Sequence, residues 1–257
     1  MSHPGSPSPR TVAVIPARLA STRLPRKVLR EIAGKPLLGW VYESAGACKL
    51  FDRIVIAVDS EEVAALCEAN HWPWRMTSPL LPSGTDRLHA VAQEIPADIY
   101  VNIQGDEPLL TPAHFAALLA PFGHAAVDAT TLRVPCPTAD IANPNVVKVV
   151  TATDGRALYF SRAAIPFNRD ATPDVPCWKH LGLYAYRRAT LERFASLPPS
   201  PLEKIERLEQ LRLLENCLTL HVAEAPEDTV GVDTEDDLHR AETLLRARLK
   251  PSQTSHT

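Results

Sequence analysis

The stretch Ile15-Pro16-Ala17-Arg18-Leu19-Ala20-Ser21-Thr22-Arg23-Leu24-Pro25-Arg26-Lys27 is the most informative part of the chain. The apolar run from Val12 to Ile15 predicts a strand buried on both faces, as in a parallel sheet. The loop that follows has five cations and no acid: Arg18, Arg23, Arg26, Lys27 and Arg30. A cationic loop at the carboxyl end of a first strand is where open α/β sheets bind phosphorylated ligands. The alternative is a solvated basic loop.

Two standard phosphate-binding motifs are absent from the sequence. It contains no Gly-x-x-x-x-Gly-Lys-Ser/Thr, which excludes a P-loop nucleotidase, and no Gly-x-Gly-x-x-Gly after the first strand, which argues against a dinucleotide dehydrogenase. Phosphates would therefore be held by side chains and loop amides. Arginine holds two phosphate oxygens at once, and lysine acts as a mobile point charge.

Composition is that of a globular protein able to bury a sizeable core, with 257 residues, 45% hydrophobic and 22% charged. A net charge of −3 gives no general attraction to nucleic acid, so we expect no nucleic-acid partner. The five scattered cysteines favour a reducing cytoplasm over a zinc site or a disulfide framework, and each is interpreted as a small buried apolar residue. They are Cys48, Cys67, Cys136, Cys177 and Cys217.

The domain prediction is a single folded unit over residues 11–246. Residues 1–10 are rich in Ser and Pro and predict a disordered tail, and residues 250–257 predict a second one. No run of 18 apolar residues exists, so we expect no membrane span.

Alternating apolar strands and helices predict βαβ units and an α/β fold with a parallel sheet. The expected strands are 12–15, 54–58, 99–103, 130–134, 146–150, 157–162, 181–186 and 218–223. The expected helices are 37–47, 61–70, 88–94, 111–119, an amphipathic helix 202–215, and a terminal helix after residue 234. Residues 72–82 and 163–179 are expected to be irregular, and an excursion as long as the second usually serves binding or subunit contact.

Several polar residues stand where these elements begin or end. Thr85 at a helix start is either an N-cap or a ligand-binding hydroxyl. Asp106 follows a strand and a glycine, and is either a magnesium ligand or an ordinary turn acid. Asp233 stands just before a Thr234–Asp237 capping box, which leaves its carboxylate free for a metal. His180 heads a strand, as a structural hydrogen-bonding group or a ligand.

Taken together, these motifs resemble the 3-deoxy-manno-octulosonate (Kdo) cytidylyltransferases, or CMP-Kdo synthetases. The matching stretches run in order over roughly residues 11–246 and are highly specific as a set. They are 15–18 with 21–25, 83–87, 104–108, Asn143-Pro144, 147–150, 157–162, 180–182, 199–203, 208–212 and 231–234.

The resemblance implies a nucleotide-diphospho-sugar transferase-like fold: a mixed, mostly parallel sheet with helices on both faces and a dimerisation extension within roughly 157–200. It implies a cytoplasmic homodimer that converts CTP and Kdo into CMP-Kdo and pyrophosphate for lipopolysaccharide synthesis, with Mg²⁺. The implied catalytic residues are Arg18 and Lys27 on the triphosphate, with Asp106 and Asp233 on the metal. The implied substrate contacts are Pro16, Ala17, Arg18, Ser21, Arg23, Ser83, Gly84, Arg87, Gln104, His180, Tyr184, Glu209 and Gln210.

One departure from the family pattern bears on the basic loop. The family commonly has Arg-Leu-Pro-Gly-Lys-Pro-Leu, whereas Arg26 and Val28 here replace the glycine and the second proline. Two alternatives to Kdo activation remain open. One is a cytidylyltransferase of the same fold acting on 8-amino-Kdo or a sialic-type acid, and the other is a non-catalytic nucleotide-binding module.

Overall fold

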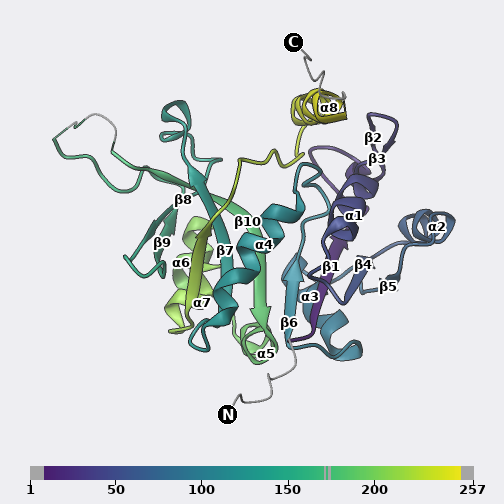
Figure 1. Cartoon of the computed structure of the whole chain (residues 1–257), viewed down its shortest axis with the longest axis horizontal. Coiled ribbons are helices and arrows are strands. Elements are labelled where there is room, and N and C mark those ends of the chain that lie inside the picture. The colour runs from purple at the N-terminus through teal and green to yellow at the C-terminus, as the bar shows by residue number, and fades with distance from the viewer. Residues whose placement is uncertain (1–8, 171, 173–174, 250–257) are drawn as a thin grey trace, which may run out of the picture.

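The computed structural model describes residues 9–170, 172 and 175–249. Within them, nine strands form one mixed sheet (Figure 1). Seven lie side by side, and only β10 runs opposite to its neighbours. In spatial order these are β11 (Leu220–Glu224), β7 (Ala129–Pro135), β10 (Trp178–Arg187), β6 (Ile99–Asn102), β1 (Thr11–Ala17), β4 (Arg53–Val58) and β5 (Trp74–Met76). β8 (Lys148–Thr151) pairs with β10 and with β9 (Ala157–Ser161).

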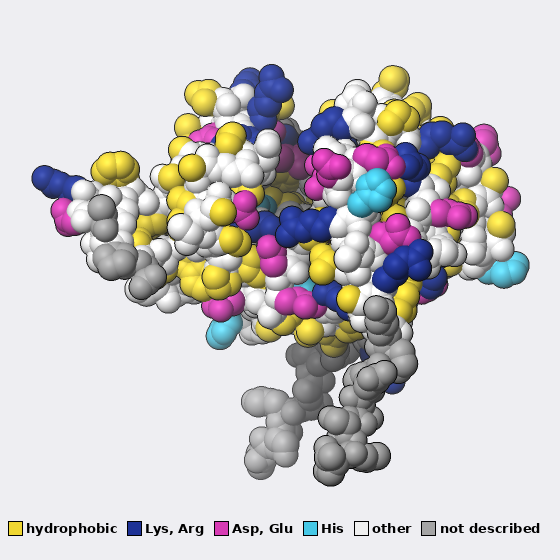
Figure 2. Space-filling view, turned by 90° about the horizontal axis from the view of Figure 1, so that it is seen from above, with side chains coloured by type: hydrophobic (Ala, Val, Ile, Leu, Met, Phe, Trp, Pro, Cys, Tyr) yellow, Lys and Arg dark blue, Asp and Glu magenta, His cyan; other side chains and the backbone are white. Residues whose placement is uncertain are grey.

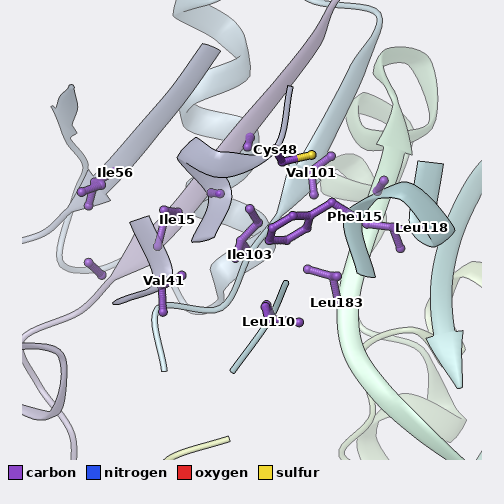
Figure 3. Packing of buried hydrophobic residues seen from close by; sticks show 14 of the residues in the cluster. Ile15, Val41, Cys48, Ile56, Val101, Ile103, Leu110, Phe115, Leu118 and Leu183 are labelled. Atoms are coloured by element: carbon purple, nitrogen blue, oxygen red, sulfur yellow. The ribbon is translucent and has the colours of Figure 1, made fainter. Parts of the chain in front are cut away.

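Helices cover both faces of the sheet. This is expected, because the apolar side chains of β1 point alternately to one face and to the other. Ala13 and Ile15 pack with three helices on one face (Figure 3). These are α1 (Leu37–Ala47), α2 (Glu61–Ala69) and α4 (Pro112–Leu119). Val12 and Val14 pack with three on the other face. These are α3 (Gly84–Glu94), α5 (Arg188–Ser196) and α7 (Leu211–Glu215). The expected mixed sheet with helices on both faces is confirmed.

The terminal helix α8 (Glu235–Leu249) packs above α1 and a short hairpin of β2 (Glu31–Ile32) and β3 (Lys35–Pro36) (Figure 1). Its start has the predicted reciprocal cap: Asp237 N–H donates to Thr234 Oγ1 at 3.2 Å, and Thr234 N–H donates to Asp237 Oδ2 at 3.0 Å. The remaining short helices are η1 (Lys27–Leu29), η2 (Ala120–Gly123) and η3 (Thr138–Asp140). Among the described residues, no helix is long and apolar enough to cross a membrane.

The predicted helix 202–215 is wrong as one element. The chain forms α6 (Pro201–Glu206) and α7, separated at Arg207, whose φ of 54° is left-handed. Glu206 accepts hydrogen bonds from Ser161 Oγ and the Arg162 amide, which fixes the end of α6 to β9. Hydrophobic periodicity does not reveal such a tertiary anchor.

Smaller differences concern short strands. The stretch 72–82, expected to be irregular, contributes the edge strand β5, and residues 31–36, for which no strand was predicted, form the β2–β3 hairpin. Residues 1–8 and 250–257, predicted as tails, lie outside the described residues. Arg10, placed in the first tail, donates its backbone N–H to Asp98 Oδ2 at 2.8 Å.

Candidate active site

The carboxyl ends of the parallel neighbours β1 and β6 approach each other closely. Gly105 follows β6, and a Cβ at this position would lie 2.7 Å from the Pro16 carbonyl oxygen. Only glycine tolerates this approach, because any larger residue would collide with backbone. The contact sets Asp106, the next residue, beside the basic loop that follows β1.

Lys27 joins two acids that are distant in sequence. Its Nζ lies 2.5 Å from Asp106 Oδ2 and 2.9 Å from Asp233 Oδ1, and Arg23 Nη2 lies 2.9 Å from Asp233 Oδ2. The Val232 N–H donates to the Asp106 carbonyl at 2.9 Å, which holds the segment before α8 against the end of β6. Burial lowers the pKa of Lys27, but the Asp106 and Asp233 carboxylates outweigh burial, so its pKa is raised and it stays an ammonium.

Arg26 stands where the family commonly has glycine, and its backbone has a conformation that glycine favours. Its φ of 56° and ψ of 32° are left-handed, a region that glycine enters without steric cost. The Arg26 carbonyl accepts the Leu29 N–H at 2.9 Å, and its guanidinium pairs with Glu62 on α2. The replacement of glycine therefore leaves the turn into η1 in place.

Arg87, which was predicted as a substrate contact, has a fully buried side chain, and its substrate role stays a prediction. Its guanidinium donates to Thr77 Oγ1, to the Ser78 carbonyl and to Asp59 Oδ2, at 2.7, 3.1 and 3.1 Å. The other Asp59 oxygen accepts the Leu19 N–H at 2.9 Å. Arg87 thus holds Asp59 in place, and Asp59 in turn holds the basic loop through the Leu19 N–H.

A cavity of about 550 Å³ opens between the basic loop, the start of α3 and the end of β6. In the view from above, acidic and basic side chains surround a hollow between two raised parts of the molecule (Figure 2). We call the cavity between the basic loop, α3 and β6 the basic cavity. Its walls include the predicted residues Pro16, Arg18, Ser21, Arg23, Lys27, Gly84, Gln104, Asp106 and Asp233.

A second cavity of about 650 Å³ shares Arg23 and Asp233 with the basic cavity. We call it the distal cavity. It contains the predicted residues His180, Tyr184 and Gln210. Gln210 is buried, and its Nε2 has no hydrogen-bond partner among the described residues. An unpaired buried amide is costly, so this group is suited to a polar ligand.

His180 is neutral in the wall of the distal cavity, because burial lowers its pKa to about 3. Its Nε2 lies 2.8 Å from Thr131 Oγ1. That hydroxyl also lies within hydrogen-bond distance of the Leu181 and Leu183 carbonyls, which only accept. We therefore assign the proton to Nε2, which leaves Nδ1 as an acceptor.

Three further predicted substrate contacts, Ala17, Ser83 and Glu209, are not among the residues that line either cavity. Ala17 is fully buried in β1. Ser83 is the N-cap of α3, accepting the Asp86 N–H at 3.1 Å, so the cap considered for Thr85 belongs to Ser83. Thr85 instead donates to Glu209 Oε2 at 2.8 Å, and burial raises the pKa of that carboxyl. Packing and internal hydrogen bonds occupy the side chains of Ala17, Ser83 and Glu209, and their roles as substrate contacts stay predictions.

Sequence reasoning missed polar residues of the distal cavity. Asn143 and Asn145 lie in its wall, together with Lys179, Asp228 and Arg240. The Asn143-Pro144-Asn145 turn was a detectable signal. Arg240 was detectable as the residue one turn beyond Asp237 on α8.

Comparison with known proteins defines the class first. A cytidylyltransferase family model matches residues 12–220. A putative glucose-1-phosphate thymidylyltransferase from Bacillus anthracis, 16% identical with a TM-score of 0.66, covers 92% of this chain and 95% of its own, and shares the fold.

Close relatives narrow the class. The 3-deoxy-manno-octulosonate cytidylyltransferase of Acidobacterium capsulatum is 63% identical over 93% of this chain and 98% of its own. The protein of the same name from Koribacter versatilis is 53% identical, over 93% and 91%. A solved CMP:2-keto-3-deoxy-manno-octonic acid synthetase complexed with CTP is 40% identical with a TM-score of 0.90, covering 93% of this chain and 100% of its own. The chain therefore belongs to the 3-deoxy-manno-octulosonate cytidylyltransferase family.

Proposed function

We propose that this protein transfers a cytidylyl group from CTP to Kdo, giving CMP-Kdo and pyrophosphate for lipopolysaccharide synthesis. The observation that carries the proposal is the Lys27–Asp106–Asp233 cluster, since Asp233 belongs to both the basic and the distal cavity. A reaction joining two substrates needs its charged groups where the two binding sites meet.

The basic cavity is the proposed nucleotide site. Arg18 lines it and has no ion-pair partner among residues 9–170, 172 and 175–249, so its guanidinium is available for phosphate oxygens. Ser21 adds a hydroxyl, and Gly84 stands in the first turn of α3, where amides favour anions. Lys27 is the proposed cation for charge that develops on the departing pyrophosphate.

Asp106 and Asp233 are the proposed Mg²⁺ ligands. Two carboxylates beside an open cavity suit this ion, which takes one or two carboxylates and completes its coordination with phosphate oxygens and water. Both acids contact one ammonium nitrogen, so their oxygens already converge around a cation. Bound there, Mg²⁺ would supply Lewis-acid polarisation and charge neutralisation.

The distal cavity is the proposed sugar-acid site. Gln210 Nε2 can donate to a sugar oxygen, and His180 Nδ1 can accept from a hydroxyl. Arg23 lines both cavities and supplies positive charge for the substrate carboxylate. These groups orient Kdo so that its anomeric hydroxyl attacks the α-phosphorus in line with the departing pyrophosphate.

A homodimer in the cytoplasm is the proposed working state. Large apolar side chains are exposed on β9, in the chain between β9 and β10, and on α6: Leu158, Phe167 and Ile205. Exposed apolar surface of this kind marks association sites. Leu158→Glu is expected to shift the molar mass measured by light scattering from dimer to monomer. A variant that stays dimeric would show that the dimer interface does not include Leu158.

The deciding experiment measures pyrophosphate release with CTP, ATP, GTP or UTP, each with and without Kdo and Mg²⁺. We expect release only with CTP, Kdo and Mg²⁺ together. Asp106→Asn and Asp233→Asn are expected to lower turnover at least about a hundredfold, or about 3 kcal/mol in the barrier. Asp236→Asn, in the exposed first turn of α8, is the matched control and should stay near wild type. Turnover retained by either cavity variant would refute the metal assignment.

A further inference from the structure

Cys136 and Cys177 lie opposite each other, outside the machinery described above. The antiparallel ladder of β7 and β10 pairs Pro135 with Trp178, which makes the two cysteines the next cross-strand pair. The Cys136 N–H donates to the Cys177 carbonyl at 2.8 Å. Hydrogen-bonded antiparallel pairs have Cα atoms about 5.5 Å apart. That separation lies within the Cα range that disulfides span.

Both thiols are reduced and half-buried. The Cys136 thiol donates to the Pro137 carbonyl at 3.7 Å, and the Cys177 thiol donates to the Ile165 carbonyl at 3.5 Å. By contrast, Cys48 and Cys67 are buried, and Cys217 is exposed. The pair is therefore accessible to a small reagent yet held together by the ladder.

The ammonium of Lys148 is near enough to affect the pair electrostatically. Its Nζ donates to the carbonyls of Asn143, Val146 and Arg162, at 2.9, 2.7 and 2.6 Å, so it cannot swing away. A neighbouring cation favours thiolate, the form that attacks disulfides, although at Cys136 burial and the Cys177 thiol outweigh Lys148 and raise the pKa.

We propose that Cys136 and Cys177 are a thiol–disulfide modification site, which reacts with small-molecule disulfides to form a reversible cross-strand bond. The bond would close the segment 137–176, which contains β8, β9 and the chain that projects from the sheet between β9 and β10 (Figure 1). Asn143 and His180, on either side of the cross-link, line the distal cavity, so the bond would fix the base of that wall. The proposal does not depend on the proposed reaction.

The chemistry balances with a small-molecule disulfide as oxidant. The thiolate of one cysteine attacks one sulfur of the reagent, breaks its S–S bond and releases one thiol. The thiolate of the other cysteine then attacks the first cysteine's sulfur, breaks the mixed disulfide and releases the second thiol. The two cysteines lose two protons and two electrons, and the reagent gains both.

The test incubates the native full chain with oxidised glutathione and measures intact mass, followed by non-reducing peptide mapping. We use Cys217→Ser as the background, because exposed Cys217 would add its own adduct. The expected product has lost two hydrogens, contains the Cys136–Cys177 linked peptide, and regains its mass with dithiothreitol. In the same background, Cys136→Ser should stop at one glutathione adduct on Cys177.

Three results would overturn the proposal: separate adducts that persist on Cys136 and Cys177, a disulfide that links two chains, or thiols that react only after denaturation. Cys136→Ala repeats the single-thiol measurement if the serine variant does not fold. Circular dichroism of every variant before oxidation verifies that the native state is being tested.

Discussion

Substitution of Arg26 by glycine and by alanine separates the backbone of the basic loop from its ion pair. Both variants lose the Arg26–Glu62 contact, which joins exposed side chains and contributes at most about 1 kcal/mol. They differ in how well they tolerate a φ of 56°, which costs a residue with a Cβ about 1 kcal/mol relative to glycine. We therefore expect Arg26→Gly to be more stable than Arg26→Ala by about 1 kcal/mol.

Urea unfolding gives the free energies, and thermal melting should separate the two variants by about 2–4 °C for a domain of this size. The matched control is Ala65→Gly, at an exposed position inside α2, where glycine should destabilise by about 1 kcal/mol. Glu62→Gln isolates the ion pair. If Arg26→Ala proved as stable as Arg26→Gly, residue 26 would not have a left-handed backbone, and the account of the loop would fail.

Three other perturbations test the site. Burial lowers the pKa of His180 to about 3, so its contribution to folding stability is complete when the pH is above the ordinary histidine pKa of 6.5 and is lost as the pH falls toward 3. His180→Gln should therefore flatten the dependence of the urea midpoint on pH in this range. Arg87→Met should cost about 3–5 kcal/mol in unfolding free energy, because Asp59 then stays buried without its cation, and a small loss would contradict the positioning role. Lys27→Met should tighten Mn²⁺ binding without nucleotide, measured by calorimetry or electron paramagnetic resonance, while turnover falls; weaker binding would show that Lys27 does not compete for the two aspartates.

The sequence predicted well the features that depend on a few neighbouring residues, and it predicted poorly those that depend on burial among residues distant in sequence. The apolar run 12–15 predicted strand β1. The Thr234–Asp237 capping box predicted that the Asp233 carboxylate stays out of the cap, and in the structure that carboxylate pairs with Lys27 and Arg23. Arg87 carries the same charge as the cavity arginines, and only the tertiary structure reveals that Thr77, Ser78 and Asp59 enclose it. The break at Arg207 was missed for the same reason, since it depends on contacts with β9.

The pairing of charges in the basic loop constrains how a nucleotide can bind. Of the five cations expected to attract phosphate, four are already paired with acids: Arg23, Arg26, Lys27 and Arg30. Arg18 alone lacks an ion-pair partner within the described part of the chain. Lys27 can turn to phosphate oxygens, and Arg23 to the carboxylate of the sugar acid, only when another cation neutralises Asp106 and Asp233. Binding of divalent metal and of nucleotide should therefore strengthen each other by the same factor, because each releases charge that the other requires.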